Sequence, residues 1–199
     1  MNKSRLRAWL RELLLLGLLL GGILAARSSL ADHYIVPSGS MEHTLYPGDR
    51  VFVDKRYYGL RIPFTRFEIL GGVDVERGDV VIFDSPHDGT RLIKRIVATG
   101  GDRVVIRRGR LSINGEPLAL PNRPDVERFG DTLAVLRLDS GGGPDHAAVL
   151  PKGSLLAVGD HRGNSRDGRF FGLIEEGDVY ARAVAVYYRR GEGVGWRTL

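Results

Sequence analysis

The 199-residue sequence predicts a mainly β protein: an antiparallel, β-rich domain with a smaller inserted β subdomain, preceded by one apolar N-terminal helix. Short runs of β-branched and other apolar residues recur along the chain, and no segment after residue 31 shows a long 3.6-residue period. Gly-Asp pairs stand just ahead of several runs, where glycine and aspartate favour turns. A chain of this length can bury a sizeable core as one domain.

The N-terminal segment begins with basic residues, and residues 13–26 then form an unbroken apolar run. Those fourteen positions would span roughly 21 Å as a helix, against about 30 Å for a hydrocarbon core. A cleavable secretory leader and a retained anchor that continues to Ala31 both fit this pattern. A buried core helix would leave a leucine surface that nothing else in the sequence covers. In either of the first two interpretations, positive charge keeps the N-terminus in the cytoplasm and the body lies outside.

Charge and composition exclude several functions. The net charge is +5, but residues 1–31 carry five cations and one glutamate, which leaves only +1 for the rest of the chain. Such a body makes no basic stripe, so we expect no nucleic-acid partner. The absence of cysteine excludes disulfides and thiolate chemistry. The five histidines show no ligand spacing, so we expect no metal and no cofactor.

From residue 32 onward, the sequence predicts strands separated by turns. Apolar runs predict strands near residues 51–53, 80–83, 92–97, 104–106 and 181–188. The Gly-Asp pairs stand at residues 48–49, 78–79, 101–102 and 177–178, and their irregular spacing indicates turns and not a structural repeat.

Two regions interrupt this pattern. Residues 57–72 are predicted to form a long surface loop close to the membrane. Residues 107–150 read as the inserted subdomain, with a hairpin, a tight Asn114-Gly115 turn and a polar stretch whose three glycines, 141–143, we expect to be mobile. The predicted organisation is therefore residues 1–31 as basic tail and apolar segment, 32–106 with 151–199 as the main β domain, and 107–150 as an insertion without the chemistry.

The first candidate for chemistry is the segment Ser38-Gly39-Ser40. A glycine between two serines allows a tight turn that presents neighbouring backbone N–H groups, as a nucleophilic serine beside an oxyanion pocket requires. Most such tripeptides are flexible turns, so this motif alone is weak.

Lys94 is the second candidate, since it stands inside an apolar strand beside Arg95. A lysine on an edge strand, where its charge discourages aggregation, is the commoner case. The alternative is a lysine buried on an apolar face, where desolvation lowers its pKa. A free lysine is about 0.04% neutral at pH 7, and a half-neutral one needs a shift of roughly 3.4 units, about 4.6 kcal/mol. Such an amine could take the proton of a serine without any histidine.

The third candidate is the polar, glycine-rich segment at residues 159–172. It has too few apolar residues for a core strand and would by default be a polar loop. As part of a site, Ser165 could orient a neutral lysine without restoring its charge. Asp167 could pair with Arg169 or Arg95.

Taken together, these segments resemble type I signal peptidases, which are serine proteases with a Ser-Lys dyad. The resemblance rests on the Ser38-Gly39-Ser40-Met41 segment after an apolar run, the runs at 77–83 and 93–102, and the segment at 159–169. It covers the chain from the apolar segment to about Gly172, with the motif blocks in order. It implies a β-rich catalytic domain on the outer face of the cytoplasmic membrane, which removes signal peptides from exported preproteins. A site that meets its substrates at the membrane also implies that the N-terminal segment is retained as a transmembrane anchor.

Residue by residue, the resemblance implies that Ser40 is the nucleophile and Lys94 the general base. The oxyanion hole would consist of the Ser38 side chain and the backbone N–H of Ser40, and Ser165 would orient Lys94. Further members of the site are the supporting residues Asp167, Arg169 and Arg95, and the pocket walls for small Ala-X-Ala side chains, Val36, Pro37, Met41 and Ile93.

The sequence departs from the family pattern at three loop positions. His43 stands where proline is usual, and His161 and Gly163 stand within the pattern Gly-Asp-Asn-Arg-Asp-Asn-Ser. None of these changes removes a catalytic residue. One rival function is a specialised, conjugation-type peptidase with the same dyad, and another is a secreted, non-enzymatic β domain with a cleaved leader. The expected partners are preproteins and membrane lipid, and the sequence does not indicate an oligomeric state.

Overall fold

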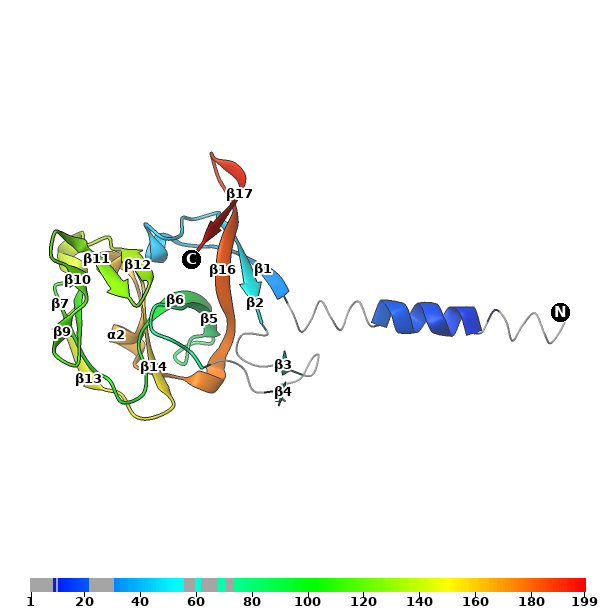
Figure 1. Ribbon diagram of the computed structural model, residues 1–199, viewed down its shortest axis with the longest axis horizontal. Coiled ribbons are helices and arrows are strands. Elements are labelled where there is room, and N and C mark those ends of the chain that lie inside the picture. The colour runs from blue at the N-terminus through cyan, green and yellow to red at the C-terminus, as the bar shows by residue number, and fades with distance from the viewer. Residues whose placement is uncertain (1–8, 10, 22–30, 56–59, 62–67, 71–73) are drawn as a thin grey trace.

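The computed structural model describes residues 9, 11–21, 31–55, 60–61, 68–70 and 74–199 (Figure 1). Antiparallel strands dominate it, as the sequence predicts. The strands are β1 Ala31–Ile35, β2 Arg50–Asp54, β3 Leu60–Arg61, β4 Glu68–Leu70, β5 Val80–Asp84, β6 Arg91–Ala98, β7 Arg103–Arg107, β8 Arg110–Ile113, β9 Glu116–Pro117, β10 Ala119–Leu120, β11 Arg123–Phe129, β12 Thr132–Val135, β13 His146–Val149, β14 Ser154–Val158, β15 Ile174–Glu175, β16 Val179–Arg189 and β17 Gly193–Thr198. Short helices lie between them: η1 Gly39–Met41, η3 Ser140–Gly142, η4 Arg162–Asn164, α2 Gly168–Phe171 and η5 Glu176–Asp178.

One large sheet carries the body of the molecule. Its strand order is β1-β2-β16-β5-β6-β14-β15, and β17 also pairs with β16. Figure 1 shows the long strand β16 running the height of this body, between β2 and β5. All five strands predicted from apolar runs are confirmed, as β2, β5, β6, β7 and β16. Lys94 lies on β6, which pairs with β5 on one side and β14 on the other, so the edge-strand interpretation of this lysine is wrong.

Three of the four Gly-Asp pairs make the same turn. Gly48, Gly78 and Gly101 have φ values of 88°, 100° and 94°, which a side chain would disfavour. The aspartate that follows each glycine accepts a hydrogen bond from a backbone N–H three residues earlier, at Tyr46, Glu76 and Thr99. The glycine allows the reversal and the carboxylate closes it, which explains why the pair recurs ahead of strands.

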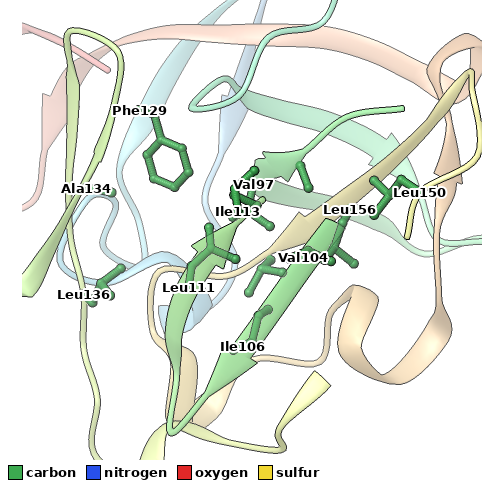
Figure 2. Packing of buried hydrophobic residues seen from close by; sticks show 12 residues of the cluster. Val97, Val104, Ile106, Leu111, Ile113, Phe129, Ala134, Leu136, Leu150 and Leu156 are labelled. Atoms are coloured by element: carbon green, nitrogen blue, oxygen red, sulfur yellow. The ribbon is translucent and has the colours of Figure 1, made fainter. Parts of the chain in front are cut away.

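Residues 103–149 build two smaller sheets, β13-β7-β8-β9 and β10-β11-β12. The first of them begins with β7 at Arg103, ahead of the predicted boundary at residue 107. The two sheets share a hydrophobic core with the main sheet, in which Val104 and Leu111 meet Leu156 of β14 and Phe129 of β11 (Figure 2). This shared core attaches the insertion to strand β14 of the large sheet.

A buried ion pair also joins the insertion to the segment at 159–172. Arg162 donates to both carboxylate oxygens of Glu127, at 2.6 and 3.1 Å, and both side chains are fully buried. The predicted mobility of the 141–143 glycines does not fit the contacts there, because Gly142 is buried and its carbonyl accepts a hydrogen bond from Arg169. The insertion therefore packs directly against the segment that was predicted to support the site.

The helix at residues 11–21 exposes its leucines, among them Leu14 and Leu18. In the part of the chain that the structure describes, the helices are too short or too polar to cross a bilayer. The predicted anchor also takes in residues 1–8, 10 and 22–30, which lie outside the described residues, and the predicted surface loop at 57–72 falls largely outside them as well.

Candidate active site

A short helical turn at residues 38–42, called the serine turn below, holds Ser40 between strands β1 and β2. Ser38 is extended, with φ −144° and ψ 162°, and the 3-10 helix η1 begins at the next residue. The fully buried side chains of Met41 and Leu45 anchor this turn in the core of the main sheet. Ser40 itself is 8% exposed, so its hydroxyl lies at the boundary between core and solvent.

Lys94 meets this serine from the middle of the sheet. Its Nζ lies 2.5 Å from Ser40 Oγ, and the lysine is 3% exposed. Burial lowers the pKa of the Lys94 amine from 10.5 to about 8, although the charges of Asp167 and Asp160 act against this shift. At this value about a tenth of the amine is neutral at pH 7, which is far more than in a solvent-exposed lysine. The pair can therefore transfer a proton from the hydroxyl to the amine near neutral pH.

Ser38 lies on the outer side of this pair. It is exposed, and its Oγ donates a hydrogen bond to Ser40 Oγ at 3.3 Å. A hydroxyl so close to the nucleophile can turn toward the oxyanion that forms on the substrate's carbonyl oxygen when Ser40 Oγ attacks. Its role in the oxyanion hole stays a prediction.

Arg95 is buried on the other face of β6, where it pairs with Asp160 and not with Asp167. Its Nε and Nη2 donate to the two oxygens of Asp160 at 2.9 and 2.8 Å. Thr44, four residues after the nucleophile, donates to the same carboxylate at 2.5 Å. This cluster ties the serine turn to β6 and to the segment that follows β14.

Asp167 pairs with Arg169, the first of the two partners considered for it. The guanidinium donates to both carboxylate oxygens at 2.9 Å, and the pair is completely buried. Asp167 also accepts from the backbone N–H of Gly159 at 2.9 Å. Residue 159 must be glycine for a separate reason, because a Cβ there would collide with Ser165 and with the Ser40 carbonyl.

The remaining predicted site residues lie near the pair but make fewer contacts with it. Ser165 Oγ is buried and has no hydrogen-bond partner among the described residues, so the expected bond to Lys94 is not made. Pro37 is exposed at the turn. Three predicted pocket residues lie in the core cluster beneath the turn, with exposed fractions of 1%, 0% and 4%: Val36, Met41 and Ile93.

A charged cluster behind the serine turn was missed by sequence reasoning. His161, which is 4% exposed, lies between the turn and Asp139 of the insertion. Arg137 joins the cluster by pairing with Asp139 at 2.8 Å and with Glu42, the last residue of the serine turn. The hydrogen bond with His161 lowers the pKa of the Asp139 carboxyl. The only signal in the sequence was His161 itself, as a departure from the family pattern.

The described residues contain no group of three or more His, Asp or Glu side chains placed to hold a metal ion. The site geometry is that of a buried amine against a hydroxyl on a tight turn. This arrangement can perform acyl transfer by nucleophilic attack.

The known proteins that this chain is similar to are described as signal peptidases. The model of a family described as signal peptidase, peptidase S26, matches residues 6–188. Signal peptidase I of Pseudomonas aeruginosa is 30% identical over 191 residues, which cover 83% of this chain and 67% of that protein. Signal peptidase I of Bacillus licheniformis is 30% identical over 194 residues, which cover 94% of this chain and 91% of that protein. A crystal structure of a signal peptidase I from Enterococcus faecalis is 24% identical with a TM-score of 0.43, covering 55% of this chain and 97% of that one.

Proposed function

The chain belongs to the signal peptidase family, peptidase S26, and is thus a serine peptidase, and we propose that it removes signal peptides after Ala-X-Ala through a dyad of Ser40 and Lys94. The observation that carries the proposal is the 2.5 Å separation between Ser40 Oγ and the buried Lys94 amine. The family rules out the rival of a non-enzymatic β domain. A specialised peptidase with the same dyad differs only in its range of substrates.

The reaction follows from the positions of these groups. Neutral Lys94 takes the proton from Ser40 Oγ, which attacks the scissile carbonyl carbon and forms a tetrahedral intermediate. The Ser38 hydroxyl and the Ser40 backbone N–H donate to the oxyanion. The Lys94 ammonium then protonates the leaving amine as the peptide C–N bond breaks. Lys94 next takes a proton from water, whose oxygen attacks the acyl-enzyme, and returns it to Ser40 as the signal peptide leaves.

We also propose that the enzyme lies at the cytoplasmic membrane. Residues 1–31 would form a cytoplasmic basic tail and a single anchor, with the catalytic domain on the outer face. The basic start, the apolar run and the exposed leucines of the helix at 11–21 support this topology. Exported preproteins and membrane lipid are then the partners. Small side chains before the cut would meet shallow pockets near Pro37, above the core residues Val36, Met41 and Ile93.

The test is cleavage of a purified preprotein whose signal ends in Ala-X-Ala. The full-length enzyme in detergent should release the mature protein, and mass spectrometry should place the cut directly after the second alanine. Ser40→Ala should release none, whereas Ser112→Ala, on β8 of the insertion, should cleave at the normal rate. A wild-type enzyme that leaves this substrate intact would contradict the proposed function.

The pH dependence of cleavage follows from the lowered pKa of Lys94. Only the neutral amine accepts a proton, so the fraction of competent enzyme grows as pH rises through about 8. We therefore expect kcat/KM to increase from about pH 6 to about pH 9, as the ammonium loses its proton. Initial rates on a fluorogenic signal-peptide substrate would measure the profile. A rate that falls over this interval would exclude a lysine base with the lowered pKa.

A further inference from the structure

The peptide unit between Gly39 and Ser40 carries one of the two proposed oxyanion donors. Its oxygen belongs to Gly39 and its N–H to Ser40. This bond is trans, so the oxygen and the N–H point in opposite directions. Whatever binds the Gly39 oxygen on one side therefore sets the direction of the Ser40 N–H on the other.

His161 binds that oxygen from behind the turn. Its Nδ1 lies 3.1 Å from Gly39 O, and because a carbonyl oxygen only accepts hydrogen bonds, the ring must donate. The backbone N–H of His161 donates to the next carbonyl, Ser40 O, at 3.1 Å. A second donor to Gly39 O is the backbone N–H of Glu42, also at 3.1 Å, from within the turn itself. His161, which lies outside the turn, thus binds the carbonyl oxygens of both Gly39 and Ser40.

The insertion holds His161 in place. Its Nε2 lies 2.7 Å from Asp139 Oδ1, and the other oxygen of Asp139 accepts from Arg137 Nε at 2.8 Å. Arg137 also pairs with Glu42, at the far end of the serine turn. The backbones of Arg137 and His161 form a β-bridge, and the Arg137 N–H donates to Asp160 O at 3.0 Å. These contacts fix the ring from both sides, and the side chain is 6% exposed.

We propose that His161 is a positioning residue, which aims the Ser40 N–H at the oxyanion by holding the Gly39–Ser40 peptide, and that Asp139 of the insertion braces it. This inference rests on the proposed function. It gives the insertion a role in catalysis, in contrast to the expectation that the insertion stays apart from the chemistry. His161 touches no reacting atom, so its effect reaches the reaction through the orientation of the hydrogen-bond donor.

The test compares three variants in preprotein cleavage. His161→Leu removes the donor, and we expect kcat to fall about tenfold with little change in KM, because the Glu42 N–H still holds Gly39 O. His161→Asn should recover most of this loss, because the asparagine amide nitrogen, like His Nδ1, is bonded to Cγ and can donate to Gly39 O. Asp139→Ala should lower kcat in the same sense but by less than His161→Leu. His87→Leu, at an exposed turn, is the matched control and should behave as wild type.

A peptide aldehyde gives a second readout that a loss of stability would not produce. It adds to Ser40 and places an oxyanion in the proposed hole, whereas a product peptide with a free carboxyl terminus does not. His161→Leu should bind the aldehyde about tenfold more weakly and the product peptide as wild type does. Equal weakening of both ligands, or a wild-type kcat in His161→Leu, would overturn the inference. If wild-type enzyme cleaves and Ser40→Ala does not, such a result leaves the proposed function standing.

Discussion

Replacement of Lys94 by methionine is expected to lower kcat by about 10⁴-fold or more, since no other base lies against Ser40 Oγ in the described part of the site. The folded state should be no less stable than that of the wild type. Burial that lowers the lysine pKa from 10.5 to about 8 disfavours the ammonium by about 3 kcal/mol, and an apolar side chain of similar length avoids this cost. Single-turnover cleavage of the preprotein and thermal unfolding would measure the two effects separately.

Lys152→Met is the matched control, because Lys152 is exposed in a turn and lies outside the site. It should cleave at the wild-type rate. An active Lys94→Met enzyme would exclude lysine as the base. If Lys94→Met is inactive and also no longer unfolds cooperatively, the loss of activity could come from misfolding. Ser40→Ala, which removes a single oxygen atom, would then test the dyad.

Asp160→Ala is expected to destabilise the fold by about 3–5 kcal/mol, because it leaves the Arg95 guanidinium buried without its carboxylate. Arg95 and Asp160 are 1% and 0% exposed, so water cannot replace the lost partner. Thr44 loses its acceptor in the same variant, which should also loosen the serine turn and reduce cleavage. Urea unfolding would give the change in free energy.

The exposed pair Arg123–Asp125 offers a matched comparison on the same protein. Its two side chains are 59% and 43% exposed, so Asp125→Ala should leave the unfolding midpoint nearly unchanged. The double variant Arg95→Met, Asp160→Leu should recover part of the stability that Asp160→Ala loses, because it leaves no buried charge unpaired. Equal unfolding midpoints for Asp160→Ala and Asp125→Ala would contradict a buried ion pair at this position.

The local patterns of the chain predicted most of the architecture. Runs of apolar residues marked β2, β5, β6, β7 and β16, because a strand that packs against a core must carry such residues. The turns at Gly48, Gly78 and Gly101 were predictable because the positive φ of the glycine and the capping carboxylate of the next residue are both local properties. The sequence singled out Ser40 and Lys94, the family resemblance supplied their roles, and the two side chains do meet in the structure.

Contacts between distant segments were harder to predict. Strand β6 pairs with β5 and β14 and is buried on both faces, where Ile93, Ile96 and Val97 enter separate core clusters, and these contacts depend on how the whole sheet is ordered and packed. Asp167 was expected to pair with Arg169 or Arg95, and it pairs with Arg169, whereas Arg95 pairs with Asp160. Several acidic residues stand close together in that segment, and only packing decides which one faces which arginine.

The sequence by itself determined the β-rich class, the tight serine turn and the lysine within an apolar strand, because each depends on residues close together in the chain. Only the tertiary structure decided that the Lys94 amine is desolvated and that His161 of one segment and Asp139 of another lie behind the Gly39 carbonyl. A pKa and a hydrogen bond depend on which groups surround an atom in space, and residues up to about 120 positions apart in the chain supply those groups here.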